Sequence, residues 1–274
     1  MNWLESLLYG IVSGITEFLP ISSFAHEHLL HKLFGVATVD PLKSLLIHMA
    51  LIVSVFTGCS NTIVQIRRAR QTHRHNKNRI RSNNYLLELR FLKNAVIPLI
   101  LGYFVLSRCI QVKVNVVWIA VFSFINFLIL IFQSRMMQGN KDERMMSVFD
   151  SFVIGLSGAL AVFPGISRIG AMLTVATMRG ISRNKAIEWA VLLSVPALAL
   201  LGFNDILSLM TATGAAAVTG NIFTYILSTI GAYVAGHMGI LLIKTFTVQK
   251  DFSAFAYYSL GVMMFALFLY LSVV

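Results

Sequence analysis

Glu17-Phe18-Leu19-Pro20-Ile21-Ser22-Ser23 and Phe163-Pro164-Gly165-Ile166-Ser167-Arg168 are two polar strings that interrupt otherwise apolar stretches of the chain. A carboxylate, an arginine, several hydroxyls and helix-breaking Pro and Gly are tolerated at membrane depth only where they line a cavity or satisfy one another. The two strings therefore predict a functional site buried between helices that break at these points.

The composition around the strings is that of an integral membrane protein. Hydrophobic residues make up 57% of the chain and charged residues 12%, and the mean hydropathy is +0.77, well above that of soluble globular proteins. We expect an all-α polytopic helical bundle, a single membrane domain over 1–274, with two broken or re-entrant helical segments at about 3–24 and 150–178. The apolar windows predicted to span the membrane are 44–58, 94–107, 114–132, 186–202, 222–243 and 254–273.

The net charge of +11 is distributed as in a membrane protein and does not indicate nucleic-acid binding. Nine Lys and Arg residues fall between Arg67 and Lys93, with Glu88 as the one acid among them. Basic connections mark the cytoplasmic side of a membrane protein, so we expect a basic cytoplasmic loop at about 64–93. Since one apolar window separates this loop from the first string, the first string should open outward.

An internal repeat is suggested by a shift of 145 residues, which places Gly10 on Gly155, Phe18 on Phe163, Ile21 on Ile166 and Ser22 on Ser167. Matching broken segments in two halves are typical of inverted-topology repeats with a site at their interface. We predict approximate repeat halves at 1–140 and 141–274. Two unrelated Pro-kinked helices are the alternative.

Arg168 and the two breaks predict an anion clamp. A guanidinium is a permanently charged fork that suits phosphate oxygens, and helices that begin after Pro20 and Gly165 would direct backbone N–H groups at the same anion. An arginine that merely reaches toward the membrane surface is the alternative.

Four residues of the first string and its continuation could supply catalytic groups beside this clamp. Ser22 and Ser23 carry hydroxyls, His26 follows Ser23 by three residues, and Glu17 could orient a group, transfer a proton or ligate a metal. Serines that bond back to a helix carbonyl are the alternative. The histidines His26, His28, His31 and His48 form a loose group without the fixed ligand spacing of a zinc site. Two acids are second-tier candidates for the functional site, Glu188 and Asp205.

The two strings carry a resemblance to a known family. Gly10 to Ser23 with Ala25-His26, and Phe163 to Arg168 with Gly170-Ala171, resemble the two signature motifs of the bacterial undecaprenyl-diphosphate phosphatase family of the bacitracin-resistance type. The likeness extends over nearly the whole chain.

The resemblance implies a multi-pass protein of the bacterial plasma membrane that hydrolyses undecaprenyl diphosphate to the monophosphate at the outer face, recycling the lipid carrier for cell-wall polymers. It implies that Ser23 is the nucleophile, His26 its base or acid, Arg168 the diphosphate clamp and Glu17 a group that handles protons or a metal. It also implies phosphate contacts and a cation bound by Glu17: the contacts are Ser22, Ser167, Gly165 and Thr16, and the cation is Mg²⁺ or Ca²⁺. Expected partners are the polyprenyl diphosphate, membrane lipids and, in a possible homodimer, a second copy of the chain.

Departures from the family pattern leave two alternatives open. Ser13 stands where many members have a second acid or an amide, which weakens the metal site, and Phe24 and Ile169 replace small or hydroxylic residues. A polyprenyl-phosphate transporter on the same scaffold is the first alternative. A phosphatase for another lipid phosphate is the second.

Overall fold

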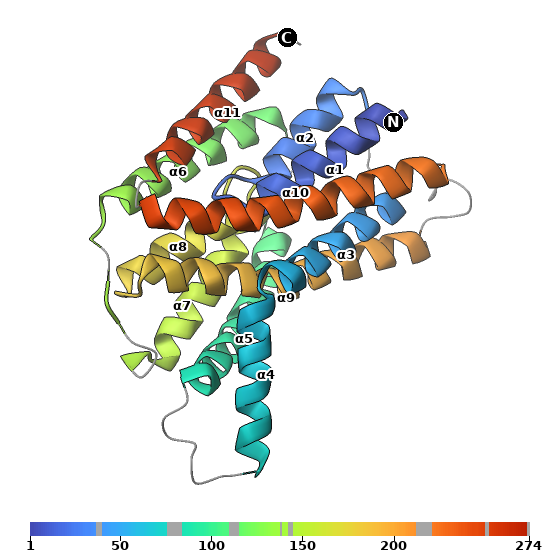
Figure 1. Ribbon diagram of the computed structural model, residues 1–274. Helices are drawn as coiled ribbons and strands as arrows, with labels where there is room; N and C mark the ends of the chain where they lie inside the picture. Colours follow the sequence, from blue (N-terminus) through green and yellow to red (C-terminus); the bar gives the residue numbers. More distant parts are fainter. Residues whose placement is uncertain are drawn as a thin grey trace.

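The computed structural model describes residues 1–36, 40–75, 84–109, 115–137, 139–141, 145–211, 221–249 and 252–272. Within these ranges the fold is all-helical, with eleven α-helices and one 3₁₀ helix (Figure 1). Six helices contain stretches that are long and apolar enough to cross a membrane, as the six sequence windows predict. They are α3 (Pro41–Gly58), α5 (Asn84–Cys109), α6 (Val116–Arg135), α9 (Arg183–Thr211), α10 (Ile222–Gln249) and α11 (Ser253–Leu271).

The two polar strings form the tips of two helical hairpins. The first hairpin joins α1 (Trp3–Phe18) to α2 (Ser23–Leu33); the second joins α7 (Val148–Gly158) and the 3₁₀ helix η3 (Ala159–Val162) to α8 (Arg168–Met178). A proline follows the first arm of each hairpin and ends it, because a Pro lacks the N–H that would continue the helix.

The same capping chemistry starts the corresponding helices of the two hairpins. A capping box starts α1 at Asn2 with Glu5, and another starts α7 at Ser147 with Asp150. The helices α2 and α8 follow serine N-caps whose side chains accept a hydrogen bond from the backbone N–H three residues on. All of these pairs differ by the shift of 145 residues that the sequence suggests.

The hairpins open at opposite ends of the bundle. The ammonium group of Lys43 lies 3.0 Å from the hydroxyl of Ser6, so the first hairpin opens where α3 begins. Arg179, at the end of α8, lies 2.6 Å from Asp150 at the start of α7, and α9 begins just beyond. Thr62, just past the end of α3, donates a hydrogen bond to Glu188 near the start of α9. The second hairpin therefore opens at the end of the bundle where α3 finishes.

Glycines let the first arm of each hairpin pack closely against a long helix. A Cβ at Gly10 would lie 2.1 Å from the carbonyl oxygen of Ser228 in α10, and a Cβ at Gly155 would lie 2.1 Å from that of Ala95 in α5. Such close backbone approach is the usual reason for small residues between membrane helices. It gives a physical reason for glycine at both of these positions.

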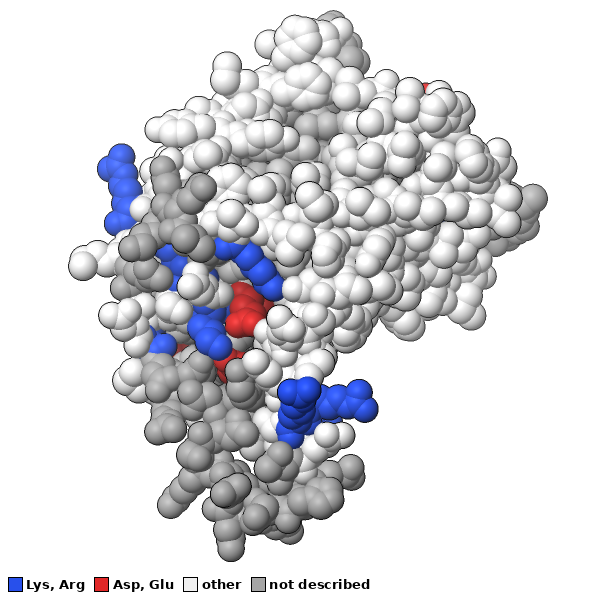
Figure 2. All heavy atoms as spheres, in the orientation of Figure 1, with Lys and Arg blue, Asp and Glu red and all other residues white. Residues whose placement is uncertain are grey.

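The described parts of the basic segment 64–93 are helical. Residues up to His75 belong to α4 (Ser60–His75), which projects from the bundle (Figure 1), and those from Asn84 onward belong to α5; residues 76–83 lie outside the described ranges. Figure 2 shows Lys and Arg side chains gathered in the lower left of this face, where Figure 1 places α4, α5 and α7. A polar helix can continue beyond a membrane span because it satisfies its own backbone hydrogen bonds.

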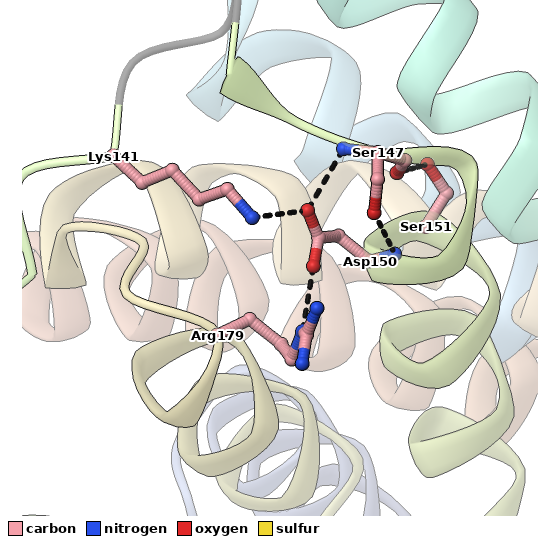
Figure 3. A network of polar contacts seen from close by, with 5 residues as sticks. All are labelled: Lys141, Ser147, Asp150, Ser151 and Arg179. Atoms are coloured by element: carbon pink, nitrogen blue, oxygen red, sulfur yellow. Dashed lines mark hydrogen bonds and ion pairs between the residues drawn. The ribbon is translucent and has the colours of Figure 1, made fainter.

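Asp150 fixes the open end of the second hairpin (Figure 3). Its carboxylate pairs with the Arg179 Nε at 2.6 Å and with Lys141, and it accepts a hydrogen bond from the Ser147 N–H at 2.8 Å. Burial raises the pKa of Asp150, but the hydrogen bonds from Lys141, Ser147 and Arg179 outweigh it and lower the pKa to about 2. The side chain is therefore a carboxylate at neutral pH, and it anchors both arms of the hairpin.

Candidate active site

The tips of the two hairpins meet in the centre of the bundle. The Gly165 N–H donates to the Ser22 hydroxyl at 3.1 Å, and the Ser167 hydroxyl donates to the carbonyl of Leu19 at 3.2 Å. Both serines are also the N-caps of their helices. Two hydroxyls that are 145 residues apart therefore each bond to the opposite hairpin.

Gly165 allows the second tip to turn. Its φ is +126°, a conformation that side chains disfavour, and a Cβ would lie 2.5 Å from the backbone nitrogen of Ser123. We expect Gly165→Ala to lower the Tm in detergent clearly and to remove function, because strain of about 1–3 kcal/mol adds to the steric clash. Gly261→Ala is the matched control, since a Cβ there meets no atom within 4 Å. Equal Tm values for the two variants would contradict this role of Gly165.

Asn126 of α6 joins the two tips, and sequence reasoning missed it. Its side-chain amide nitrogen donates to the carbonyl of Pro20 at 3.2 Å and to the Ser259 hydroxyl at 2.9 Å. Its amide oxygen accepts from the Ser167 N–H at 3.0 Å, and the side chain is fully buried. One asparagine in an apolar window is a weak sequence signal, because its partners lie far away along the chain.

Replacing Asn126 by aspartate is expected to destabilise the protein strongly. The shape is kept, but a carboxylate cannot donate to Pro20 or Ser259, and it becomes a buried acid without a counter-ion. An unsatisfied buried group costs about 1–3 kcal/mol, and a charged one more. Thermal unfolding in detergent is the measurement, with Ser134→Ala near the end of the same helix as the control. An unchanged Tm for Asn126→Asp would contradict the role of Asn126 as a link between the tips.

Glu17, Ser23 and Arg168 form a compact polar cluster at this junction. The Glu17 Oε1 lies 2.9 Å from the Arg168 Nη2, and the Glu17 Oε2 accepts a hydrogen bond from the Ser23 hydroxyl at 2.7 Å. Glu17 is 7% exposed and Arg168 9%. The Arg168 Nη1 is buried without a hydrogen-bond partner in the described part of the chain, so it is a donor available to an anion.

The cluster lines a cavity of about 450 Å³. Its walls are largely apolar, with a smaller polar share. The cavity reaches Ser44 near the start of α3 and Ser107 near the end of α5, which is the end of the bundle where the first hairpin opens. The apolar lining includes Leu51, Leu99, Val162, Ile166, Leu200 and Leu201.

Four of the predicted site residues do not line this cavity. His26 lies on another face of α2, where its ring stacks on Tyr258 and its Nε2 lies 2.8 Å from that hydroxyl. Thr16 bonds back to the carbonyl of Val12 at 2.6 Å. Gly165 and Ser167 build the tip rather than the cavity wall. Of the predicted residues, Glu17, Ser22, Ser23 and Arg168 line the cavity.

The predicted metal site has one carboxylate at the junction, that of Glu17. The Glu17 Oε2 accepts the hydrogen bond of Ser23, and Oε1 lies 2.9 Å from the Arg168 Nη2 but accepts no hydrogen bond within the described residues. Among the described residues, no three His, Cys, Asp or Glu side chains are grouped so that they could hold a metal ion. A Mg²⁺ or Ca²⁺ ion that reaches the site with a diphosphate stays a prediction.

Comparison with known proteins gives a consistent result. Residues 6–265 match the family model described as "Bacitracin resistance protein BacA". The chain is 27% identical to undecaprenyl-diphosphatase 1 of Shouchella clausii (strain KSM-K16) over 264 residues, which cover 94% of this chain and 93% of that protein. It is 28% identical to the undecaprenyl-diphosphatase of Thermosipho africanus (strain TCF52B) over 268 residues, covering 97% and 99% of the two chains.

Proposed function

This chain belongs to the bacitracin resistance protein BacA family, and from that premise we propose that it is a membrane enzyme that hydrolyses undecaprenyl diphosphate to the monophosphate and inorganic phosphate. Family membership over residues 6–265 and full-length similarity to proteins named undecaprenyl-diphosphatase support the proposal. The observation that carries it is the contact of Glu17 with both Ser23 and Arg168, with the Arg168 Nη1 left available to a phosphate.

The chemistry starts at Ser23. Its hydroxyl points at Glu17, which takes the proton while the Ser23 oxygen attacks the terminal phosphorus. The bond from that phosphorus to the bridging oxygen breaks, and the lipid monophosphate leaves. Arg168 binds the phosphate oxygens and stabilises the charge that develops on them. Water then hydrolyses the phosphoserine, which releases inorganic phosphate.

The cavity suits an isoprenyl substrate. Its apolar walls can pack against the first units of a polyprenyl chain, and its polar end receives the diphosphate. Desolvation between apolar helices also strengthens the contact between Arg168 and phosphate, because charges interact more strongly where water is excluded.

The proposed orientation directs the cavity mouth to the outside of the cell. The cavity opens at the end of the bundle where α3 begins, whereas Arg67, Arg70 and Lys185 lie beyond the end of α3 or beside it. Basic residues favour the cytoplasmic side. In this arrangement the two hairpins are re-entrant segments that enter from opposite membrane faces, as inverted-topology repeats do. Matching caps at a shift of 145 residues support the repeat.

Cysteine labelling tests the orientation. In a chain that lacks Cys59 and Cys109, a cysteine at the exposed position 32 of α2 is expected to react with an impermeant maleimide in intact cells. A cysteine at the exposed position 70 of α4 is expected to react only after the membrane is opened. The reverse pattern would contradict the outward-facing mouth.

Phosphate release from polyprenyl diphosphates tests the function. The purified protein in detergent is expected to convert farnesyl and undecaprenyl diphosphate to the monophosphates and inorganic phosphate. A parallel reaction with chelator shows whether a divalent cation takes part. A folded protein that binds the lipid but releases no phosphate would favour the transporter alternative.

A further inference from the structure

The cavity contains a histidine and a carboxylate that the mechanism above does not use. His48 of α3 and Asp205 of α9 face each other, with the His48 Nδ1 2.7 Å from the Asp205 Oδ2. Their side chains are 15% and 17% exposed, and both residues line the cavity that holds Glu17, Ser23 and Arg168.

The pair could serve only to join two helices, but its position argues for chemistry. The helices α3 and α9 already pack closely around Gly202, where a Cβ would lie 3.3 Å from Met49 and 3.4 Å from Leu45. The two helices therefore do not need the pair to stay together, and a buried ion pair adds little stability because desolvation offsets the attraction. His48 and Asp205 present their side chains to the cavity, where a ligand or water can reach them.

Asp205 determines what the imidazole can do. A carboxylate that holds the Nδ1 fixes the orientation of the ring and leaves the Nε2 as the nitrogen that accepts or gives a proton. His28 and His31 also line the cavity, but within the described residues they pack on aromatic rings and neither has a carboxylate hydrogen bond. Of these three imidazoles, His48 is the one that a carboxylate orients for proton transfer.

The hydrolysis of a phosphoserine at Ser23 needs a base that Glu17 cannot supply. After the first step Glu17 holds the Ser23 proton, and it remains beside Arg168. His48 lines the same cavity as Glu17 and Ser23, so water in that cavity can reach both the imidazole and the phosphoserine. A base can act directly or through one water molecule.

We propose that His48, oriented by Asp205, is the general base for the second half of the reaction, an inference that rests on the proposed function. The His48 Nε2 takes a proton from water as the water oxygen bonds to phosphorus. The bond from phosphorus to the Ser23 oxygen breaks, and that oxygen recovers its proton from Glu17. Phosphate leaves, and the imidazolium of His48 returns its proton to solvent at the cavity mouth. His48 is thus a catalytic residue, and Asp205 is a positioning residue.

The test separates the two halves of the reaction. Substrate labelled with ³²P in the terminal phosphate is mixed with His48→Ala, His48→Gln or Asp205→Asn protein in detergent. We expect the turnover of His48→Ala to be slower by about 100-fold or more, the scale of general-base catalysis. The variant should still release one equivalent of lipid monophosphate rapidly. The label should stay on Ser23, and added imidazole should restore phosphate release. Asp205→Asn should show a milder form of the same defect.

Two controls keep the test decisive. His48→Gln retains a donor for Asp205 but has no base, so it should fold and still accumulate phosphoserine. His237→Ala removes an imidazole that contacts Thr57 and does not line the cavity, and it should turn over normally without any effect of imidazole. Normal turnover of both His48 variants, or loss of the rapid first step in a folded variant, would overturn the role of His48. Absence of phosphate release by the unmodified protein, or full activity of Ser23→Ala, would instead overturn the proposed function.

Discussion

Replacing Arg168 by lysine is expected to raise the KM for polyprenyl diphosphate by about 10- to 100-fold, and replacing it by alanine is expected to remove activity. The guanidinium is 9% exposed, and it uses Nη2 for Glu17 and keeps Nη1 for the substrate. A lysine ammonium is a point charge that cannot make both contacts in one plane. Steady-state kinetics with farnesyl diphosphate measure the effect.

A double variant separates the binding role of Arg168 from its structural role. Arg168→Ala leaves the Glu17 carboxylate buried without its partner, which costs about 3–5 kcal/mol, so lost activity alone could reflect unfolding. Glu17→Gln combined with Arg168→Met removes both charges and should regain most of the Tm while staying inactive. Activity in that double variant, or an unchanged KM in Arg168→Lys, would contradict the claim that Arg168 binds the diphosphate.

Replacing Ser23 by alanine is expected to lower kcat by about 10⁶-fold, the scale seen when a catalytic serine nucleophile is removed. The Tm and the substrate affinity should change little, since within the described residues the hydroxyl donates to Glu17 alone, and loss of that hydrogen bond costs about 1 kcal/mol. Single-turnover kinetics measure the chemical step directly.

Ser157→Ala is the matched control for Ser23→Ala. The Ser157 hydroxyl bonds back to the carbonyl of Ile154 at 2.7 Å within the second hairpin, and it does not line the cavity. It should keep normal turnover. A Ser23→Ala protein that forms product at an unchanged rate would remove Ser23 from the mechanism.

The sequence predicted the fold because membrane helices leave strong local signals. A long apolar window is recognised without any knowledge of tertiary contacts. Each of the six windows coincides with a helix that is long enough to span a membrane. The two polar strings were predictable because they are polar where the surrounding sequence is apolar. Charged residues such as Glu17 and Arg168 are costly in hydrocarbon, so their presence there indicates a functional site. The family assignment made from these strings is confirmed by the match over residues 6–265.

The position of His26 outside the cavity has a geometric cause. Helix residues turn about 100° each, and the cavity face of α2 runs through Ser23, Phe24, Glu27, His28 and His31. On that face residues follow Ser23 by one, four, five and eight positions. His26 lies three positions after Ser23. Around the helix axis, this places it on the opposite side of Ser23 from the cavity face, next to Tyr258. A spacing of three alone does not tell which side of a residue the cavity occupies.

Asn126 and Asp205 were hard to assign because their roles depend on long-range contacts. Asn126 bonds to Pro20, 106 positions away, and Asp205 to His48, 157 positions away. A single sequence gives no register between such distant helices. The helical state of α4 was missed for another reason: its polar residues lack the apolar period by which a span is recognised.

The most direct test of the central claim is phosphate release from undecaprenyl diphosphate by the folded, purified protein beside its Ser23→Ala and Arg168→Ala forms. The meeting of the two hairpin tips at Glu17, Ser23 and Arg168 predicts release by the unmodified protein and none by either variant while the variants remain folded. Release at an undiminished rate by a folded Ser23→Ala or Arg168→Ala protein would contradict the claim that the reaction takes place at this junction.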